Sequence, residues 1–350
     1  MDEKKAWIHL AIFLFLLIGC HSFEQEQQWL AQNINDFEIA VSELEEGGGF
    51  MMVARGGDIY GELEPIFLET PQDPLTAIVL NGADGDQSIT YLLKIFYNYE
   101  EVFFRIGSSE YMSEFVFSID AGYRFDIPIY LDLPLTSSNT NSISKLTAGL
   151  FVYPEQLAMI NLDADEENFI RFWNNNILNF EINYGYDAPI ILTMPEYEDV
   201  TTIVDMPLAS ISVTQFFDFP YVEFEPGFLD VEWMDSLELL HLQTTPGESI
   251  ELAFVANLHS SVTEGLQGFV LISMIDWQQV IMSDQPYLYI STDPTAIEIS
   301  QFGHFFVDAP NDPGFYEFVM LAIPNPTAPL SWGNYFPLEI ARFTIEVVDQ

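Results

Sequence analysis

Two short acidic loops carry the residues best suited to hold a metal ion. In the stretch NGADGDQS, Asp84 and Asp86 lie two residues apart, and in NLDADEEN, Asp163 and Asp165 have the same spacing. Calcium prefers hard oxygen ligands supplied by a loop, so these four carboxylates are weak calcium candidates. Neither loop has the full EF-hand pattern, and such pairs also arise by chance in a chain with 54 acidic residues.

Apart from these carboxylates, the chain offers few groups for metal or nucleophilic chemistry. Beyond Cys20 the histidines are His21, His241, His259 and His304, and no two of them have the i, i+4 spacing of a helical zinc site. The sequence contains no G-x-S-x-G elbow and no G-x-x-x-x-G-K-[ST] loop. We expect no cofactor other than calcium. Whether the protein is an enzyme stays open, and a non-enzymatic protein is favoured.

Carboxylates and aromatic rings leave room for carbohydrate chemistry. Paired acids can cleave glycosides, but among so many acids the sequence does not single out a pair. Trp173, Trp233, Trp277 and Trp332 could stack on sugar rings. Trp277 belongs to a predicted strand and is expected in a core, whereas Trp332, in the stretch PLSWGNYF, is the better candidate for exposure.

The only cysteine, Cys20, directly follows an apolar run from Ala6 to Gly19, and Lys4 and Lys5 precede that run. A membrane-spanning helix needs about 20 apolar residues, whereas the core of a signal peptide needs roughly 7–15 after a positively charged start. The chain becomes polar immediately after the cysteine, with HSFEQEQQ. Residues 1–19 are therefore predicted to be a signal peptide.

The residues Leu17-Ile18-Gly19-Cys20 resemble the lipobox of bacterial lipoproteins. The resemblance implies that the Cys20 thiol carries a diacylglycerol, that the chain is cut just before it, and that the protein is extracytoplasmic and anchored to a bacterial membrane. It covers this segment alone. Two alternatives are cleavage after Ser22 and an uncleaved signal anchor. A lone cysteine that is acylated leaves no free thiol in an oxidising compartment, and no disulfide can form.

The charge of the chain limits its partners. A net charge of −45, with 54 acidic and 9 basic residues, would repel nucleic acid and anionic lipid headgroups. The charge is compatible with cationic partners, or with anionic partners bridged by divalent ions. The sequence does not decide whether the partner is a protein or a glycan. Apolar residues make up 49% of the chain, enough for a core rather than a disordered polyanion.

A helical segment is predicted before the strands begin. Leu30, Ile34, Phe37, Val41 and Leu44 are spaced alternately four and three residues apart, which is typical of an apolar stripe on a helix. The glycines at 47–49 would end that helix. Residues 20–49 are therefore expected to form a short helical tether.

From about residue 50 the pattern alternates with the period of β-strands. The apolar residues Phe125, Ile127, Ile129, Leu131 and Leu133 share one face of the stretch FDIPIYLDL. IELAFVANL and FTIEVV repeat this alternation, and turn residues separate the runs. Many short alternating strands indicate an all-β sandwich or barrel.

An internal repeat suggests two copies of one unit. Residues 92–102 align with 270–280, residues 145–156 with 315–326, and residues 179–185 with 342–348, always in the same order. Chance similarity between strands is the alternative. The acidic, proline-bounded residues 195–207 read as a linker, across which few contacts are expected.

These patterns predict an all-β protein with two tandem immunoglobulin-like β-sandwich domains after a short N-terminal helix. The sandwiches would span residues 50–194 and 208–350. The function expected is that of a lipid-anchored, non-enzymatic surface module for binding or assembly. The alternative is a surface protein that binds or cleaves carbohydrate.

Overall fold

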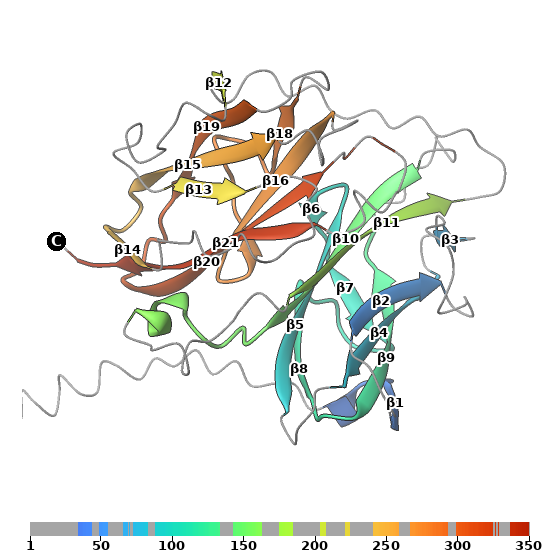
Figure 1. Cartoon of the computed structure of the whole chain (residues 1–350). Helices are drawn as coiled ribbons and strands as arrows, with labels where there is room; N and C mark the ends of the chain where they lie inside the picture. Colours follow the sequence, from blue (N-terminus) through green and yellow to red (C-terminus); the bar gives the residue numbers. More distant parts are fainter. Residues whose placement is uncertain are drawn as a thin grey trace, which may run out of the picture.

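The computed structural model describes residues 34–43, 49–54, 66–68, 70, 73–82, 88–133, 143–162, 175–184, 204–207, 221–224, 241–258, 267–292, 299–324, 326, 328 and 337–349. Nearly all regular structure in these ranges is β-strand, arranged in four sheets. The all-β prediction is confirmed. We call β1–β11 the N-terminal half and β12–β21 the C-terminal half (Figure 1).

The N-terminal half contains two sheets. Sheet A has the order β1-β9-β4-β2, with β7 also pairing with β9. Sheet B has the order β3-β11-β10-β5-β6, with β8 also pairing with β5. The strands of sheet A are β1 (Ala40–Glu43), β2 (Gly49–Ala54), β4 (Leu75–Asn81), β7 (Phe104–Ile106) and β9 (Tyr123–Leu131). Those of sheet B are β3 (Ile66–Leu68), β5 (Ile89–Tyr97), β6 (Glu100–Glu101), β8 (Glu114–Ile119), β10 (Ile143–Val152) and β11 (Asn176–Tyr184).

The C-terminal half repeats this order of strands, except that β13 pairs with β15 in parallel whereas β2 pairs with β4 antiparallel, and β7 has no counterpart among the described strands. Sheet C has the order β12-β19-β15-β13, and sheet D has the order β14-β21-β20-β16-β17 with β18 also pairing with β16. The strands of sheet C are β12 (Val204–Pro207), β13 (Tyr221–Phe224), β15 (Ser249–Leu258) and β19 (Ile299–Asp308). Those of sheet D are β14 (His241–Thr244), β16 (Gly268–Ile275), β17 (Gln278–Gln279), β18 (Leu288–Ser291), β20 (Gly314–Pro324) and β21 (Leu338–Val347).

Each half has its own hydrophobic core between its two sheets. In the N-terminal half the alternating residues of β9, from Phe125 to Leu131, face side chains of β5, β8 and β10 across that core. In the C-terminal half Ile250, Leu252 and Phe254 of β15 face β16, β20 and β21 in the same way. The strand faces predicted from the alternation are therefore confirmed.

A third core lies between the halves. Leu92, Phe96 and Phe151 of sheet B pack with side chains such as Ile272 and Val319 of sheet D. Sheets B and D are thus covered on both faces, and the order of layers is A, B, D, C (Figure 1). The expectation of few contacts between the halves is wrong, because strands such as β5 are buried on both faces, with Leu93 and Ile95 in one core and Leu92 and Phe96 in the other.

The halves also share an unusual turn. Asn98 and Tyr99, between β5 and β6, have φ angles of 49° and 71°, and Asp276 and Trp277, between β16 and β17, have φ angles of 46° and 65°. Two successive positive φ angles are typical of a type I′ hairpin turn, which normally takes Asn or Gly at both positions. Both turns instead have an aromatic residue, Tyr99 or Trp277, at the second position.

Strand register refines the predicted alignment of the two halves. Leu146 lies opposite Tyr97, and Phe318 lies opposite Ile275, the counterpart of Tyr97. Leu146 therefore corresponds to Phe318, whereas the sequence alignment had placed it two residues earlier, at Tyr316. The shift of two keeps each residue on the same face of its strand, so the repeating pattern could not reveal it.

The predicted helical tether is wrong over its described part. Ile34–Asp36 form one 3-10 turn, η1, and Ala40–Glu43 form β1, paired antiparallel with β9. Phe37 packs edge-on against Phe115 of β8, with 4.9 Å between ring centroids. Of the predicted apolar stripe, Ile34 and Phe37 therefore pack against the N-terminal core, whereas Val41 is 49% exposed. Residues 20–33 and 44–48 lie outside the described residues.

The predicted linker is described only at its end. Residues 204–207 form β12, which pairs with β19, and residues 195–203 lie outside the described part.

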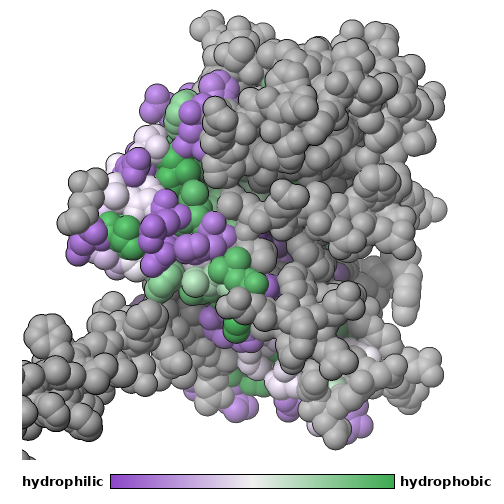
Figure 2. Space-filling view, turned by 60° about the vertical axis from the view of Figure 1, so that its left-hand side comes forward, coloured by the Kyte–Doolittle hydropathy of each residue, from purple (hydrophilic) through white to green (hydrophobic). Residues whose placement is uncertain are grey.

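The described residues contain little helix. A second 3-10 turn, η2, spans Ala158–Asn161. None of the described helices has the length and hydropathy to cross a bilayer. On the face drawn in Figure 2, hydrophobic residues form small areas separated by hydrophilic ones.

Candidate functional site

A buried polar cluster joins the two halves, and Arg342 of β21 lies at its centre. Its strand neighbours Ala341 and Phe343 point into the C-terminal core, so alternation directs Arg342 to the opposite face of sheet D. That face is covered by sheet B and by the segment that follows β10. Arg342 is 2% exposed. A guanidinium in such a place needs acceptors for its donors.

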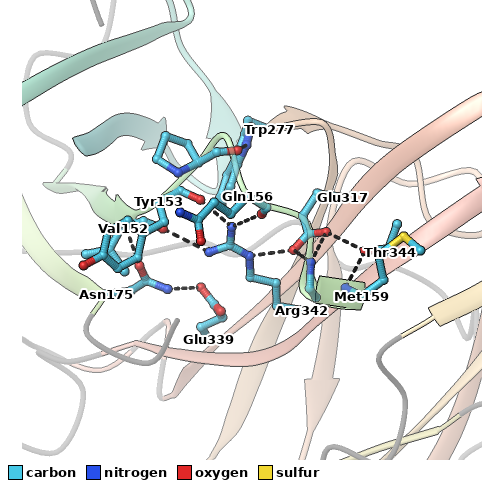
Figure 3. A network of polar contacts seen from close by, with 12 residues as sticks. Val152, Tyr153, Gln156, Met159, Asn175, Trp277, Glu317, Glu339, Arg342 and Thr344 are labelled. Carbon is cyan, nitrogen blue, oxygen red and sulfur yellow. Dashed lines mark hydrogen bonds and ion pairs between the residues drawn. The ribbon is translucent and has the colours of Figure 1, made fainter. Parts of the chain in front are cut away.

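The acceptors for Arg342 come from both halves (Figure 3). Its Nη1 donates to the carbonyl oxygen of Val152 at 3.1 Å, and its Nη2 donates to those of Tyr153 and Gln156, both at 3.0 Å. The guanidinium carbon lies 4.9 Å from the centre of the Trp277 ring. One side chain of the C-terminal half therefore binds three backbone carbonyl oxygens of the N-terminal half.

Glu317 of β20 supplies the negative charge. Its Oε1 accepts a hydrogen bond from Arg342 Nε at 2.7 Å, and its Oε2 accepts one from Thr344 Oγ1 at 3.1 Å. The backbone N–H of Ala158, at the start of η2, also donates to this carboxylate, at 3.0 Å from Oε2. Burial raises the pKa of Glu317, and the charge of Arg342 opposes that shift. The pair thus ties η2 to sheet D.

Glu339 is the member of the cluster with an incomplete set of partners. Its Oε2 accepts a hydrogen bond from Asn175 Nδ2, but its buried Oε1 has no hydrogen-bond partner among the described residues. Burial raises the pKa of Glu339 to about 8. The carboxyl is therefore mostly protonated at neutral pH, which avoids a second buried negative charge beside Glu317.

Two equivalent contacts run in opposite directions across the junction between the halves. The Tyr99 hydroxyl donates to the carbonyl oxygen of Pro326 at 3.1 Å, and Trp277 Nε1 donates to that of Pro154 at 3.2 Å. Both aromatic residues occupy the second position of a matching turn, and both carbonyls follow the matching strands β10 and β20. The junction is therefore close to self-complementary, like an isologous dimer interface within one chain.

The junction also buries most of the described positive charge. Lys94 pairs with Glu101 at 2.8 Å, and Lys145 pairs with Glu181 at 2.7 Å and donates to the carbonyl oxygen of Ala328. Burial lowers the pKa of Lys145. With Arg342, these three cations are each at most 4% exposed, in a chain with only 9 basic residues. The cluster fastens the halves together and removes three of the chain's few cations from the surface.

Of the histidine, tryptophan, cysteine and aspartate residues considered from the sequence, only Trp277, His241 and His304 lie within the described ranges. Trp277 is 1% exposed at the junction, as expected for a core residue. His241 contacts Glu346 at 3.0 Å, and His304 contacts Glu251 at 2.6 Å, on different sheets. In the described ranges, no three His, Cys, Asp or Glu residues are grouped as metal ligands. The residues outside those ranges are Cys20, His21, Asp84, Asp86, Asp163, Asp165, Trp173, Trp233, His259 and Trp332.

Sequence reasoning missed the junction, although one signal was available. Lys94, Lys145 and Arg342 are isolated cations inside apolar strands of a chain that is otherwise poor in basic residues. A lone cation in such a strand suggests a buried ion pair. Its partner could not be named, because Glu317 and Arg342 come together only through strand pairing.

No known protein family and no curated protein match the sequence. Among solved structures, a multi-copper oxidase from Pediococcus acidilactici aligns with 81% of this chain and 50% of its own, at 9% identity and a TM-score of 0.19. The McoA multicopper oxidase of Aquifex aeolicus aligns with 81% of this chain and 57% of its own, at 12% identity and a TM-score of 0.18.

A third structure, the C-terminal domain of the Streptococcus pyogenes antigen I/II-family protein AspA, aligns with 86% of this chain and 99% of its own. The identity is 11% and the TM-score is 0.19. This chain thus spans about half the length of the two oxidases. Similarities at these TM-scores carry no argument about its activity.

Proposed function

We propose that the protein is a lipid-anchored, extracytoplasmic surface module that binds or assembles without catalysis. In this proposal Cys20 carries the diacylglycerol at a bacterial membrane, and two related immunoglobulin-like sandwiches form the body. The sheet order of the two halves and their matching turns, at Tyr99 and Trp277, support a tandem duplication.

The observation that carries the proposal is the placement of charge. Three cations are buried in the junction, so an excess of acids faces solvent in a chain with a net charge of −45. Such a surface attracts cationic partners, or anionic partners through bridging divalent ions, and repels nucleic acid. The buried carboxylates Glu317 and Glu339 are covered by both halves, so they have no access to a substrate.

Detergent partitioning tests the anchor. We expect the wild-type protein to enter the detergent-rich phase of Triton X-114 and to incorporate a clickable fatty acid, and Cys20→Ser to lose both properties. Ser22→Ala is the matched control, because it alters the alternative cleavage site and leaves the lipobox intact. A Cys20→Ser protein that still carries acyl chains would refute the anchor.

A second candidate function, carbohydrate binding, is favoured by one specific feature. Phe103 and Tyr111, near the outer face of sheet A, are 54% and 49% exposed. Exposed rings with polar neighbours are the surfaces on which sugars stack. A glycan array with the mature protein, together with a panel of chromogenic glycosides, separates glycan binding, glycan cleavage and neither.

A further inference from the structure

Arg105 and three aromatic residues form a distinct surface on the N-terminal half. We call Phe103, Arg105, Tyr111 and Tyr130 the arginine platform. Arg105 of β7 lies opposite Tyr130 of β9 in the strand register. The guanidinium carbon is 4.2 Å from the centre of the Tyr130 ring and 5.8 Å from that of Tyr111.

Alternation explains why this group faces outward. Phe104 is fully buried in the N-terminal core, and it forms an isolated antiparallel bridge with Met112, which packs against the same core. The neighbouring residues of both, Phe103, Arg105 and Tyr111, therefore point away from the core. The platform lies outside the junction and outside the contacts that hold the halves together.

Arg105 differs from every other described cation. Lys94, Lys145, Arg124 and Arg342 each pair with a carboxylate at 2.6–2.8 Å. Within the described residues Arg105 has no carboxylate within ion-pair distance, although the chain has 54 acids. It donates one hydrogen bond, from Nη1 to the carbonyl oxygen of Gly107. A guanidinium carries five N–H donors, so donors remain for a ligand.

The loop that presents Tyr111 is fixed before any ligand arrives. Phe104 and Met112 exchange backbone hydrogen bonds of 2.8 and 2.7 Å, and Ser109 Oγ accepts one from the Ile106 N–H at 3.0 Å. Gly107, with φ of +55°, donates to the carbonyl oxygen of Pro128 at 3.2 Å. A site that is already ordered loses less conformational entropy on binding.

From these contacts we infer that the arginine platform binds a neutral glycan. The exposed rings of Phe103 and Tyr111 offer flat apolar faces to the C–H faces of a sugar, and the free donors of Arg105 match its hydroxyl oxygens. The net charge of −45 disfavours a polyanionic glycan at long range, whereas a neutral one is not repelled. This inference rests on the second candidate function above.

Binding to the full mature chain tests the inference by calorimetry. The probes are neutral tetrasaccharides of glucose, of mannose and of N-acetylglucosamine, with tetragalacturonate as the anionic comparison. We expect at least one neutral probe to bind, and Arg105→Ala and Tyr111→Ala each to weaken that binding at least about tenfold, the loss of one good contact.

Two matched variants serve as controls. Arg124→Ala removes the same charge from the same face of sheet A, where Arg124 is already paired with Asp126. Phe306→Ala removes an aromatic ring that is 41% exposed in the other half. Both should bind as the wild type does. Thermal melting of every variant verifies that a loss of binding is not a loss of folding.

Salt and chelator complete the test. A neutral ligand held by stacking and hydrogen bonds should bind equally well at 0.01 and 0.15 M salt and in the presence of EDTA. The inference is overturned if no neutral probe binds at about 10 mM, a concentration that reveals even very weak sites. It is also overturned if tetragalacturonate alone binds, if EDTA abolishes binding, or if Arg105→Ala binds like the wild type. None of these results would affect the detergent partitioning that tests the anchor.

Discussion

Glu101 and Gln279 exchange hydrogen bonds across the junction. The N–H of Glu101 donates to Gln279 Oε1 at 2.6 Å, and the N–H of Gln279 donates to Glu101 Oε2 at 2.9 Å. The two residues occupy matching positions in β6 and β17. Reciprocal contacts of this kind are what a twofold axis between the halves would produce, but one of the two side chains is a carboxylate and the other an amide.

Gln279→Glu should therefore destabilise the protein. The substitution places a second carboxylate against Glu101 and removes the amide that donates to the carbonyl oxygens of Tyr99 and Pro286. We expect a loss of about 1–3 kcal/mol in the free energy of unfolding at pH 7, measured with urea. The loss should shrink as the pH falls towards 4 and carboxylates gain protons. A loss that is independent of pH would contradict the repulsion.

Arg342→Met should lower the free energy of unfolding more than any surface substitution does. It leaves Glu317 buried without its counter-charge, and removing one partner of a buried pair typically costs about 3–5 kcal/mol. Arg124→Met, which breaks a partly exposed pair, should cost less than about 1 kcal/mol. Arg342→Lys should be intermediate, because it keeps the charge but cannot reach all of the carbonyl acceptors. Equal losses for Arg342→Met and Arg124→Met would show that the junction cluster is not a major source of stability.

Glu339 should make the protein less stable as the pH rises. Its pKa is about 8 in the folded protein, against an ordinary 4.5, so the folded state holds a proton that the unfolded state releases. That contribution is fully present below pH 4.5 and is lost as the pH rises through 8, by at most about 1.4 kcal/mol per pH unit.

Glu339→Gln tests this sign, because glutamine stays neutral at every pH and keeps the shape. The difference in unfolding free energy between the variant and the wild type should grow in favour of the variant from pH 5 to pH 8. Glu155→Gln, an exposed carboxylate near the same cluster, should leave the pH profile of the wild type unchanged. Parallel profiles for the wild type and Glu339→Gln would place the Glu339 pKa at its ordinary value.

Salt should stabilise the protein through screening. Like charges come closer on folding, and the Debye length falls from about 30 Å at 0.01 M to about 8 Å at 0.15 M, so the melting temperature should rise over this range. If calcium at matched ionic strength raises it further, Asp84, Asp86, Asp163 and Asp165 are the residues to replace by asparagine. Equal effects of calcium and sodium chloride at matched ionic strength would show that calcium acts by screening alone and binds no specific site.

The strands were predictable from the sequence because alternation records burial directly. The face from Phe125 to Leu131 was assigned correctly, and so was the buried position of Trp277. The helical spacing around Phe37 was misleading, because pairing of β1 with β9 and packing on Phe115 override local helix preference.

The junction itself was not predictable. Periodicity identifies which residues share a strand face, but it does not identify which sheet covers that face. Arg342 and Thr344 alternate with the core residues of β21 and would face solvent in a single sandwich, but the other half buries them. The arginine platform escaped notice for the same reason, because Arg105 and Tyr130 are neighbours only through strand pairing.

The turns at Tyr99 and Trp277 have a consequence for the synthesis of the chain. A bulky residue with positive φ costs about 1–3 kcal/mol, and both rings are stabilised by carbonyl acceptors in the opposite half. The last strand of the N-terminal half ends at Tyr184, whereas β21, which supplies Arg342, begins at Leu338. At roughly 5–20 residues per second, the ribosome needs roughly 8–30 s for the intervening segment. Until the second half is complete, we expect the face of sheet B that carries Leu92, Phe96 and Phe151 to stay uncovered and to need shielding by chaperones before the protein folds.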